Sequence, residues 1–312
     1  MGIDNWTTAL KTFRNNHSKP KIIDSDIKKI EDNIFNKYKG TEIIIGGPPC
    51  QGFSMSGKRD VLDERNNLFR EMHRVVKIIK PKVFVIENVV GLLSMKSTRG
   101  NLIKDEIISS FSSLGYNINY KIMDAAQHGV PQSRKRVIFV GTIFENFVFP
   151  KEKTKVTTVG EALGNIPNVD KTHYEEPTND YQFLMSSNLK EIFNHRAMNH
   201  NNDIVKRISF VPQGGNWKDV PSEFYNVGGN HSNNYKRLDP KKPSITLKHA
   251  TKSMIIHPFH DRVITAREVA RLQSFSDDFI FFGKIHEQHQ QLANAVPPLL
   301  GQEIAKQISK YV

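Results

Sequence analysis

Residues 42–54 read Glu-Ile-Ile-Ile-Gly-Gly-Pro-Pro-Cys-Gln-Gly-Phe-Ser, an apolar run that passes directly into glycines and prolines. Three consecutive β-branched isoleucines are typical of a buried strand, and the Gly-Gly-Pro-Pro sequence ends it. A second apolar run of strand length occupies residues 82–87. Apolar side chains recur at helical spacing between the two runs, until Pro81 ends the helix: Leu68, Met72, Val75, Val76 and Ile79. This order of strand, helix and strand predicts an α/β fold with a doubly wound, mostly parallel sheet.

The alternation continues only to about residue 142, with a helix expected over 102–114 and strands over 116–123 and 137–140. Residues 143–236 are rich in Asn, His, Pro and Gly, which predicts a lobe with little regular structure. A helical pattern returns at the capping box of Thr265 and Glu268. The last helix carries Leu300, Ile304 and Ile308 on one face. We therefore divide the chain into residues 1–142, the lobe 143–236, and a part 237–312 that returns to the first.

Composition narrows the class of protein. The 312 residues carry 44 Lys and Arg against 32 Asp and Glu, a net charge of +12. This excess favours a polyanionic partner such as nucleic acid, although on charge alone a protein that is merely basic fits equally well. The single cysteine excludes an internal disulfide and favours a reducing compartment. No stretch approaches the roughly 20 apolar residues of a membrane helix, and the first residues do not form a secretory signal.

The single cysteine, Cys50, follows a predicted strand directly. In a parallel sheet this position lies at the carboxyl edge, where ligands bind in such folds. Pro48 and Pro49 restrict the backbone, while Gly47 and Gly52 permit tight turns and close approach to a substrate. The residues alone leave two interpretations open: a presented nucleophile, or a small buried apolar side chain.

Charged residues end the neighbouring predicted strands. Glu87 closes the strand over 82–87, at the same edge as Cys50, where a buried or half-buried carboxyl group can stay protonated and donate a hydrogen bond, or transfer a proton. A capping or ion-paired glutamate fits the same position. Arg134 and Arg136 enter the strand over 137–140 two residues apart, and alternation places both on one face. They suit a phosphate or a base carbonyl, or form a solvated basic edge.

Taken together, Pro-Cys-Gln at 49–51, Glu-Asn-Val at 87–89 and Gln-x-Arg-x-Arg at 132–136 resemble the signature blocks of the C5-cytosine DNA methyltransferases of bacterial restriction-modification systems. Residues 237–246, 267–275 and 291–298 resemble the later blocks of the same family. The lobe 143–236 is unmatched and corresponds to the part that reads the DNA sequence in the family. The resemblance implies a Rossmann-like class I methyltransferase domain, with a small target-recognition lobe.

The resemblance also implies a mechanism. Cys50 would add as a thiolate to C6 of a cytosine, so that C5 can attack the methyl group of S-adenosylmethionine. Glu87 would bind the N3 edge of the base, Arg136 its O2, and Arg134 would support the site or a phosphate. The cytosine must leave the duplex to reach Cys50, so the family resemblance implies base flipping.

Contacts to duplex DNA are expected both near Cys50 and in the lobe. Arg and Lys suit guanine edges and phosphates, whereas Asn and Gln suit adenine edges. The candidates for DNA contact are Gln51, Ser54, Asn216, Lys236 and Arg237.

The beginning of the sequence departs from the family. Its members open with a strand and a Phe-x-Gly-x-Gly loop that holds the methionine part of S-adenosylmethionine, and a second strand then ends in an acid. Neither feature is present, and Gly2 stands where the acid is expected. We therefore expect a catalytic domain truncated at its N-terminus and an incomplete cofactor site. The positions that still match cofactor contacts are Ile3, Asp26, Ile27, Pro49, Leu68, Asn294 and Ala295.

This omission predicts a structural defect. The strand over 21–23 would have no neighbour, and the edge of the strand over 42–46 would be uncovered, which favours pairing with another chain. We expect residues 1 to about 38 to be poorly docked, and the chain alone to bind S-adenosylmethionine weakly.

Other functions stay open beside the methyltransferase. The chain could be a non-catalytic DNA-binding fragment, or the larger subunit of a split enzyme completed by an N-terminal polypeptide. The large RNA cytosine methyltransferase family uses a cysteine where this chain has Glu87 and Asn88, so that mechanism is excluded, while a transfer-RNA-methylating relative of the DNA type is not. We expect a cytoplasmic bacterial protein with a cognate restriction endonuclease as functional partner, no membrane contact and no metal site.

Overall fold

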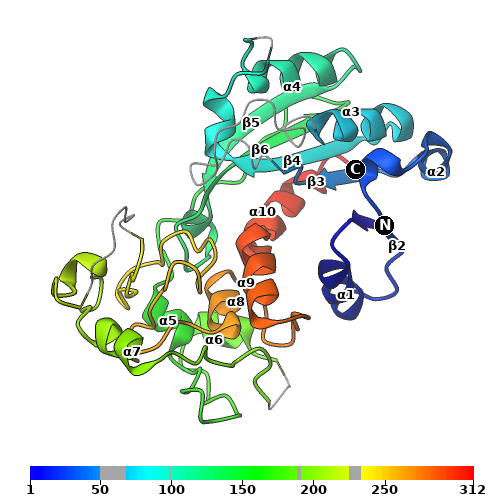
Figure 1. Cartoon of the computed structure of the whole chain (residues 1–312). Coiled ribbons are helices and arrows are strands. Elements are labelled where there is room, and N and C mark those ends of the chain that lie inside the picture. The colour runs from blue at the N-terminus through cyan, green and yellow to red at the C-terminus, as the bar shows by residue number, and fades with distance from the viewer. Residues whose placement is uncertain (50–67, 99, 188–190, 225–232) are drawn as a thin grey trace. The chain divides into compact units, whose positions relative to one another are not determined.

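The computed structural model describes residues 1–49, 68–98, 100–187, 191–224 and 233–312 (Figure 1). The chain divides into two compact units. The first unit comprises Met1–Asp24, Ala125–Arg134 and Lys153–Leu300. The second unit comprises Ser25–Asp124, Lys135–Glu152 and Gly301–Val312.

The second unit contains a four-stranded sheet in the order β3-β4-β6-β5. Its strands are β3 (Ile43–Gly46), β4 (Val83–Val89), β5 (Asn117–Asp124) and β6 (Lys135–Thr142). β3 and β4 are parallel, with Ile45 opposite Val85. Within the described residues β3 pairs with β4 alone and is an edge strand, and Ile45 is 74% exposed. The expectation of an uncovered edge beside the Gly-Gly-Pro-Pro segment is confirmed for this part of the chain.

The sheet, predicted to be mostly parallel, is mixed, with one parallel and two antiparallel pairings among its four strands. β6 is antiparallel to both of its neighbours, β4 and β5, so that β5 runs in the same direction as β3 and β4. The physical reason is the connection between β5 and β6, because residues 125–134 contain only the short 3-10 helix η5 (Ala125–His128). A parallel neighbour would require a longer crossover, usually through a helix. The α/β class predicted from the sequence is confirmed.

Helices cover one face of this sheet. α3 (Leu68–Ile79) and α4 (Ile103–Ser112) pack against alternate residues of β4 and β6 (Figure 1). The packed side chains include Met72, Val76, Phe84, Ile107, Phe111 and Phe139. The residues of opposite parity are buried as well: Val83, Val85, Ile138 and Val140. Burial on both faces explains why these strands read as continuous apolar runs in the sequence.

Short helices complete the second unit. α2 (Asp32–Asn36) and the 3-10 helix η1 (Ile27–Lys29) lie beside α3, because Arg74 donates hydrogen bonds to the carbonyl oxygens of Ile27 and Ile30 and to the carboxylate of Asp32. The remaining elements are the 3-10 helix η4 (Val90–Ser94) and residues 301–308 of α10 (Pro298–Ile308). Leu300, Ile304 and Ile308 are buried along α10, which confirms the predicted apolar face.

The first unit has its largest apolar core around α8 (Ala266–Leu272), all of whose residues are buried. α5 (Val159–Leu163), α6 (Asp180–Met185) and α9 (Ile285–Asn294) contribute to the same core. The predicted capping box is confirmed, since Thr265 accepts from the Glu268 amide and Glu268 accepts from the Thr265 amide.

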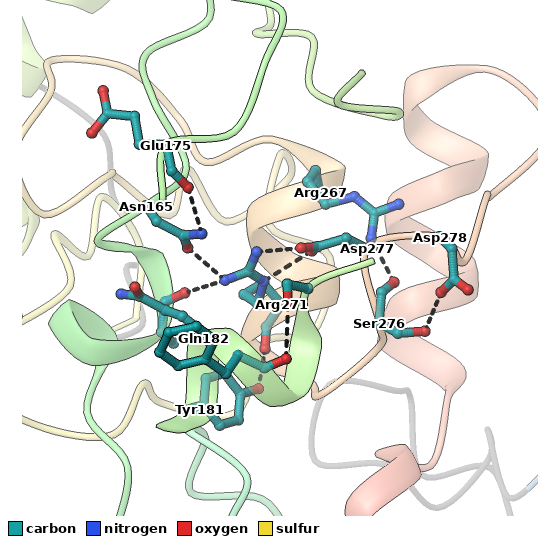
Figure 2. A network of polar contacts seen from close by, with 12 residues as sticks. Asn165, Glu175, Tyr181, Gln182, Arg267, Arg271, Ser276, Asp277 and Asp278 are labelled. Carbon is teal, nitrogen blue, oxygen red and sulfur yellow. Dashed lines mark hydrogen bonds and ion pairs between the residues drawn. The ribbon is translucent and has the colours of Figure 1, made fainter. Parts of the chain in front are cut away.

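Buried charges on α8 are compensated by polar partners. Figure 2 shows the guanidinium of Arg271 between the carboxylate of Asp277 and the side chain of Asn165. The hydroxyl of Tyr181 donates to the carbonyl oxygen of Arg271. Arg267 donates to the carbonyl oxygen of Ser276 (Figure 2). The two arginines of the 267–275 block therefore stabilise the core of the first unit.

The loop-rich segment 143–236 contains α5, α6, α7 (Asn202–Ser209) and the 3-10 helix η6 (Trp217–Asp219) among long irregular stretches. A small apolar cluster holds its later half together, formed by Ile208, Val211, Val220, Tyr235 and Ile256.

The N-terminal residues are better docked than the sequence predicts. β1 (Gly2–Asp4) and β2 (Ile22–Asp24) form a parallel pair, so the strand expected to lack a neighbour has one. α1 (Thr7–Asn16) exchanges two hydrogen bonds between Asn16 and the backbone of Ile280, each of 2.8 Å. Thr12 accepts from the Phe282 amide at 2.9 Å. The expectation that residues 1–38 are poorly docked is wrong, because polar side chains of α1 and the Arg74 contacts to residues 27–32 anchor this region.

Candidate active site

The parallel pairing of β3 and β4 brings two functional segments to one edge of the sheet. Gly46 lies opposite Ile86, so Gly47 and Glu87 both follow at the carboxyl ends of adjacent strands. A Cβ atom added at Gly47 would lie 3.5 Å from Oε2 of Glu87. The Gly47 backbone therefore lies beside the Glu87 carboxylate, with ordinary van der Waals room for a Cβ atom.

Asn88 links the Pro48 backbone to β4 through a hydrogen bond. Its Nδ2 donates to the carbonyl oxygen of Pro48 at 3.0 Å, and its Oδ1 accepts from the amide of Val89 at 2.9 Å. The side chain is buried. Sequence reasoning quoted Asn88 within the Glu-Asn-Val block but gave it no role. An amide directly after the strand-ending acid was the only available signal.

Glu87 and Arg136 form an ion pair. Nε of Arg136 lies 2.9 Å from Oε1 of Glu87, and the side chains are 13% and 15% exposed. Antiparallel register sets this geometry, because Arg136 lies opposite Val89 and Ile138 lies opposite Glu87. Burial lowers the pKa of Arg136, and the adjacent Glu87 carboxylate opposes that shift. The result is a half-buried carboxylate and guanidinium side by side, beside the Gly47 backbone.

Arg134 precedes β6 and belongs to the first unit. Its side chain is 1% exposed, and Nη2 donates to the carbonyl oxygens of Ala293 and Ala295 at 2.8 and 3.0 Å. These bonds fix the backbone at the C-terminal end of α9. Arg134 therefore contacts the block at residues 291–298, whereas Arg136 contacts Glu87.

Three predicted site residues, Cys50, Gln51 and Ser54, lie outside the described residues. The segment that leads to them is described as far as Pro49.

The predicted cofactor residues fall in both units. Ile3, Asn294 and Ala295 belong to the first unit, and Asp26, Ile27, Pro49 and Leu68 to the second. In the second unit the Asp26 carboxylate caps η1 by accepting from the Lys28 amide at 3.0 Å, and the Ile27 carbonyl accepts from Arg74 at 2.9 Å. A half-buried isoleucine beside a carboxylate suits an adenine ring and its amino group.

The predicted DNA contacts in the lobe have different surroundings. Asn216 caps η6 through its side chain, and Lys236 donates from Nζ to the carbonyl oxygen of Gly214. Arg237 is 6% exposed, and its three guanidinium nitrogens donate to four carbonyl oxygens and to Asp261: Ile208, Val211, His257 and His260. All five of its N–H groups are used, so the geometry gives Arg237 a structural role, in which it links residues 208–211 of the lobe to residues 257–261.

A sequence model described as C-5 cytosine-specific DNA methylase matches residues 1–310. The chain belongs to this family. The match covers nearly the whole sequence and includes the segments that carry Glu87, Arg134 and Arg136. The methyltransferase activity predicted from the signature blocks is thus confirmed: the enzyme is a C5-cytosine DNA methyltransferase.

Bacterial relatives agree with this assignment. The methyltransferase is 38% identical over 344 residues to the type II methyltransferase M.DdeI of Desulfomicrobium norvegicum, a match that covers all of this chain and 83% of the relative. It is also 38% identical over 307 residues to the type II methyltransferase M1.HphI of Haemophilus parahaemolyticus, with 96% and 77% covered.

Solved structures share the fold of the methyltransferase. A protein described as a DNA modification methyltransferase encoded within a prophage (E. coli) superposes with a TM-score of 0.79 at 24% identity, covering 99% of this chain and 91% of the other. The S. pombe Dnmt2 methyltransferase gives a TM-score of 0.61 at 16% identity, with 99% and 89% covered. At these identities the likeness concerns the fold alone.

Proposed function

We propose that this methyltransferase modifies a cytosine flipped out of duplex DNA through a covalent Cys50 adduct, as the modification enzyme of a type II restriction-modification system. The observation that carries the chemical part is the Glu87–Arg136 pair beside the segment that leads to Cys50. The type II assignment rests on the two relatives of that class.

The pair suits a cytosine because N3 and O2 of the base are adjacent atoms. The Glu87 carboxyl group would bond N3, and the Arg136 guanidinium would bond O2. Addition of the Cys50 thiolate to C6 places negative charge on the ring, and these two contacts would neutralise it. A carboxyl group and a guanidinium held 2.9 Å apart before substrate arrives need little rearrangement. Arg134 would support the site by fixing residues 293–295.

S-adenosylmethionine would supply a sulfonium methyl group for attack by C5. The residues proposed to hold it are Ile3, Asp26, Ile27, Pro49, Leu68, Asn294 and Ala295. Asp26 would accept from the adenine amino group, with Ile27 packed on the ring. This assignment is supported by the fixed positions of both residues at the start of η1. Loss of the C5 proton to a base would then allow the thiolate to leave.

DNA contacts are proposed for Gln51 and Ser54 near the nucleophile, and for Asn216 and Lys236 in the target-recognition lobe 143–236. Residues 1–142 and 237–312 would form the catalytic part, with a class I, doubly wound topology. Arg237 is left out of these contacts because its donors are used inside the lobe. Unstacking the cytosine costs a few kcal/mol, which phosphate contacts by lysines would offset.

We also propose that the cofactor site is completed by a strand and glycine loop carried on another segment or polypeptide. Support comes from β3, an edge strand with an exposed Ile45 next to the site. In this form the chain would be the larger subunit of a split methyltransferase in a bacterial cytoplasm, with a cognate endonuclease as functional partner. A non-catalytic DNA-binding fragment is the alternative. Within the described residues no helix is long and apolar enough to span a membrane.

Methyl transfer tests the proposal. The chain, alone and with an added polypeptide that carries the family's first strand and glycine loop, is incubated with tritiated S-adenosylmethionine and duplex DNA, beside a Cys50→Ala control. We expect incorporation that the substitution abolishes, and trapping of the wild-type protein on DNA that contains 5-fluorocytosine, which has no C5 proton to lose. Absence of incorporation under both conditions would favour the non-catalytic fragment. Transfer to transfer RNA rather than DNA would contradict the proposed substrate.

A further inference from the structure

Three histidines gather in the first unit, away from the residues discussed above. His249 lies in the turn over residues 248–254, and His286 and His289 are one helical turn apart on α9. The ring centroid of His249 lies 5.8 Å from that of His286 and 6.1 Å from that of His289, with the second pair stacked at 26°. His249 and His289 are buried, whereas His286 is exposed. The cluster therefore joins the turn to the start of α9.

The Thr251 hydroxyl contacts the rings of both His249 and His286. Its Oγ1 lies 3.0 Å from Nδ1 of His249 and 3.3 Å from Nδ1 of His286. A hydroxyl carries one proton, so it donates to one ring nitrogen and accepts from the other, which must bear a hydrogen. Because Nδ1 of His286 faces Thr251, Nε2 is the nitrogen that its exposed ring can offer to a ligand.

An exposed cationic side chain, Lys252, belongs to the same turn as His249 and Thr251. Lys252 follows Thr251, is exposed, and forms no salt bridge within the described part of the chain. Burial lowers the pKa of His249, and both Lys252 and His286 lower it further. The Glu268 carboxylate opposes the lowering of the His289 pKa. The same carboxylate forms an ion pair with Arg262 at 2.6 Å. Lys252 and His286 both act electrostatically on His249, so both lie near its ring, where an anion could contact them together.

A metal ion is a poorer match than an anion. The described residues contain no group of three His, Cys, Asp or Glu side chains arranged to hold one. Nδ1 of His249 and Nδ1 of His286 both face the Thr251 hydroxyl, so these two nitrogens are directed at a hydroxyl group and not at a common ion. A lysine ammonium and an imidazole N–H are, in contrast, both donors that suit phosphate.

We propose that Lys252 and His286, held together by Thr251 and His249, bind one phosphate of the DNA backbone. This inference rests on the proposed function, in which duplex DNA is the substrate. The site lies outside the lobe 143–236 and adds to the contacts proposed there. It would orient the duplex relative to α9, whose C-terminal end leads to the carbonyl groups that Arg134 holds.

Salt-dependent binding tests the site. Duplex DNA is titrated with the wild-type chain, Lys252→Ala and His286→Gln, and with Lys11→Ala, which removes an exposed lysine of α1 in the same unit. We expect the first two variants to bind on the order of threefold to tenfold more weakly, equally with and without a target site. The slope of log K against log salt should become shallower by about one for Lys252→Ala. Lys11→Ala should match the wild type.

A neutral phosphate analogue separates a direct contact from an indirect effect. Methylphosphonate is placed at each backbone position in turn, which removes one negative charge at a time. One position should weaken wild-type binding without weakening Lys252→Ala further. Equal affinities and slopes for the wild type and both variants would overturn the phosphate site and leave the proposed function intact. A wild-type chain that does not bind duplex DNA would overturn both.

Discussion

At the scale of single residues, the active site depends on pairs that the sequence places far apart. Glu87 lies near the end of β4 and Arg136 near the start of β6, and only the register of the two strands makes them partners. Asn88 holds the backbone of Pro48 in the same way. Each of these side chains is at least half-buried, so its partner determines which chemistry it can perform.

Glu87→Gln tests the carboxylate without changing its shape. The substitution removes the group proposed to bond cytosine N3 and leaves the half-buried Arg136 without its counter-charge. We expect kcat for methyl transfer to fall by about 10²- to 10⁴-fold, the usual contribution of a positioned acid or base. DNA affinity should change little, because phosphate contacts supply most of it. A kcat within threefold of the wild type would contradict the assigned role.

At the scale of elements, α8 and β3 differ in how far their side chains are buried. Every residue of α8 is buried, and its charges are compensated inside the core. Glu268 bonds Arg262 through both carboxylate oxygens at 2.6 and 2.9 Å, in addition to the Thr265 amide. β3, in contrast, leaves one edge and the Ile45 side chain uncovered in the described part of the chain.

Glu268→Gln should destabilise the first unit strongly. Removing one partner of a buried ion pair leaves Arg262 uncompensated, which typically costs about 3–5 kcal/mol. Urea unfolding followed by circular dichroism measures the change. Glu175→Gln is the matched control in the same unit, because Glu175 and its ion-pair partner Lys171 are both exposed and their pair should contribute less than about 1 kcal/mol. Equal effects of the two substitutions would show that the buried network does not stabilise the unit.

Ile45→Lys should reduce self-association of the chain. An exposed isoleucine on an unpaired strand edge favours pairing with another chain, and a lysine there opposes it. Light scattering during concentration should show a higher solubility limit for the variant than for the wild type. Lys substitution at exposed Val148, which lies outside the sheet, provides the comparison. If Val148→Lys raises solubility as much as Ile45→Lys, the edge of β3 is not the cause.

At the scale of the whole molecule, the folded chain buries two neutral histidines and an ionised glutamate. Acid favours the protonated form of all three side chains. Burial lowers the pKa of His257 to about 3, against the opposing effect of Glu268. Burial lowers the pKa of His289 to about 3 as well. The pKa of Glu268 is lowered to about 2, because Arg262 and the neighbouring histidines outweigh its burial.

Stability should therefore fall as the pH drops. Below 6.5 the unfolded chain protonates these histidines while the folded chain keeps them neutral down to about pH 3, so acid favours unfolding in that window. The contribution of Glu268 is present above pH 4.5 and is lost as the pH falls toward 2. Thermal unfolding midpoints between pH 8 and 4 should decline from about pH 6.5 downward, less steeply in His289→Phe. A midpoint independent of pH across this range would contradict the assignment.

The sequence by itself determined the family, the α/β class and the order of the elements. Signature blocks and the periodicity of apolar residues are local features of the sequence, so they can be recognised without knowledge of the fold. The helix at Leu68–Ile79 and the capping box at Thr265 are local in the same sense, and both were predicted correctly.

Only the tertiary structure decided which distant groups are partners. It turned β6 antiparallel, gave the strand at Ile22–Asp24 a neighbour, and docked α1 through Asn16 and Thr12. It also used the donors of Arg237 inside the lobe and gathered His249 with His286. These outcomes depend on strand register and on hydrogen bonds between residues up to 270 positions apart, for which no pattern in the sequence carries a signal.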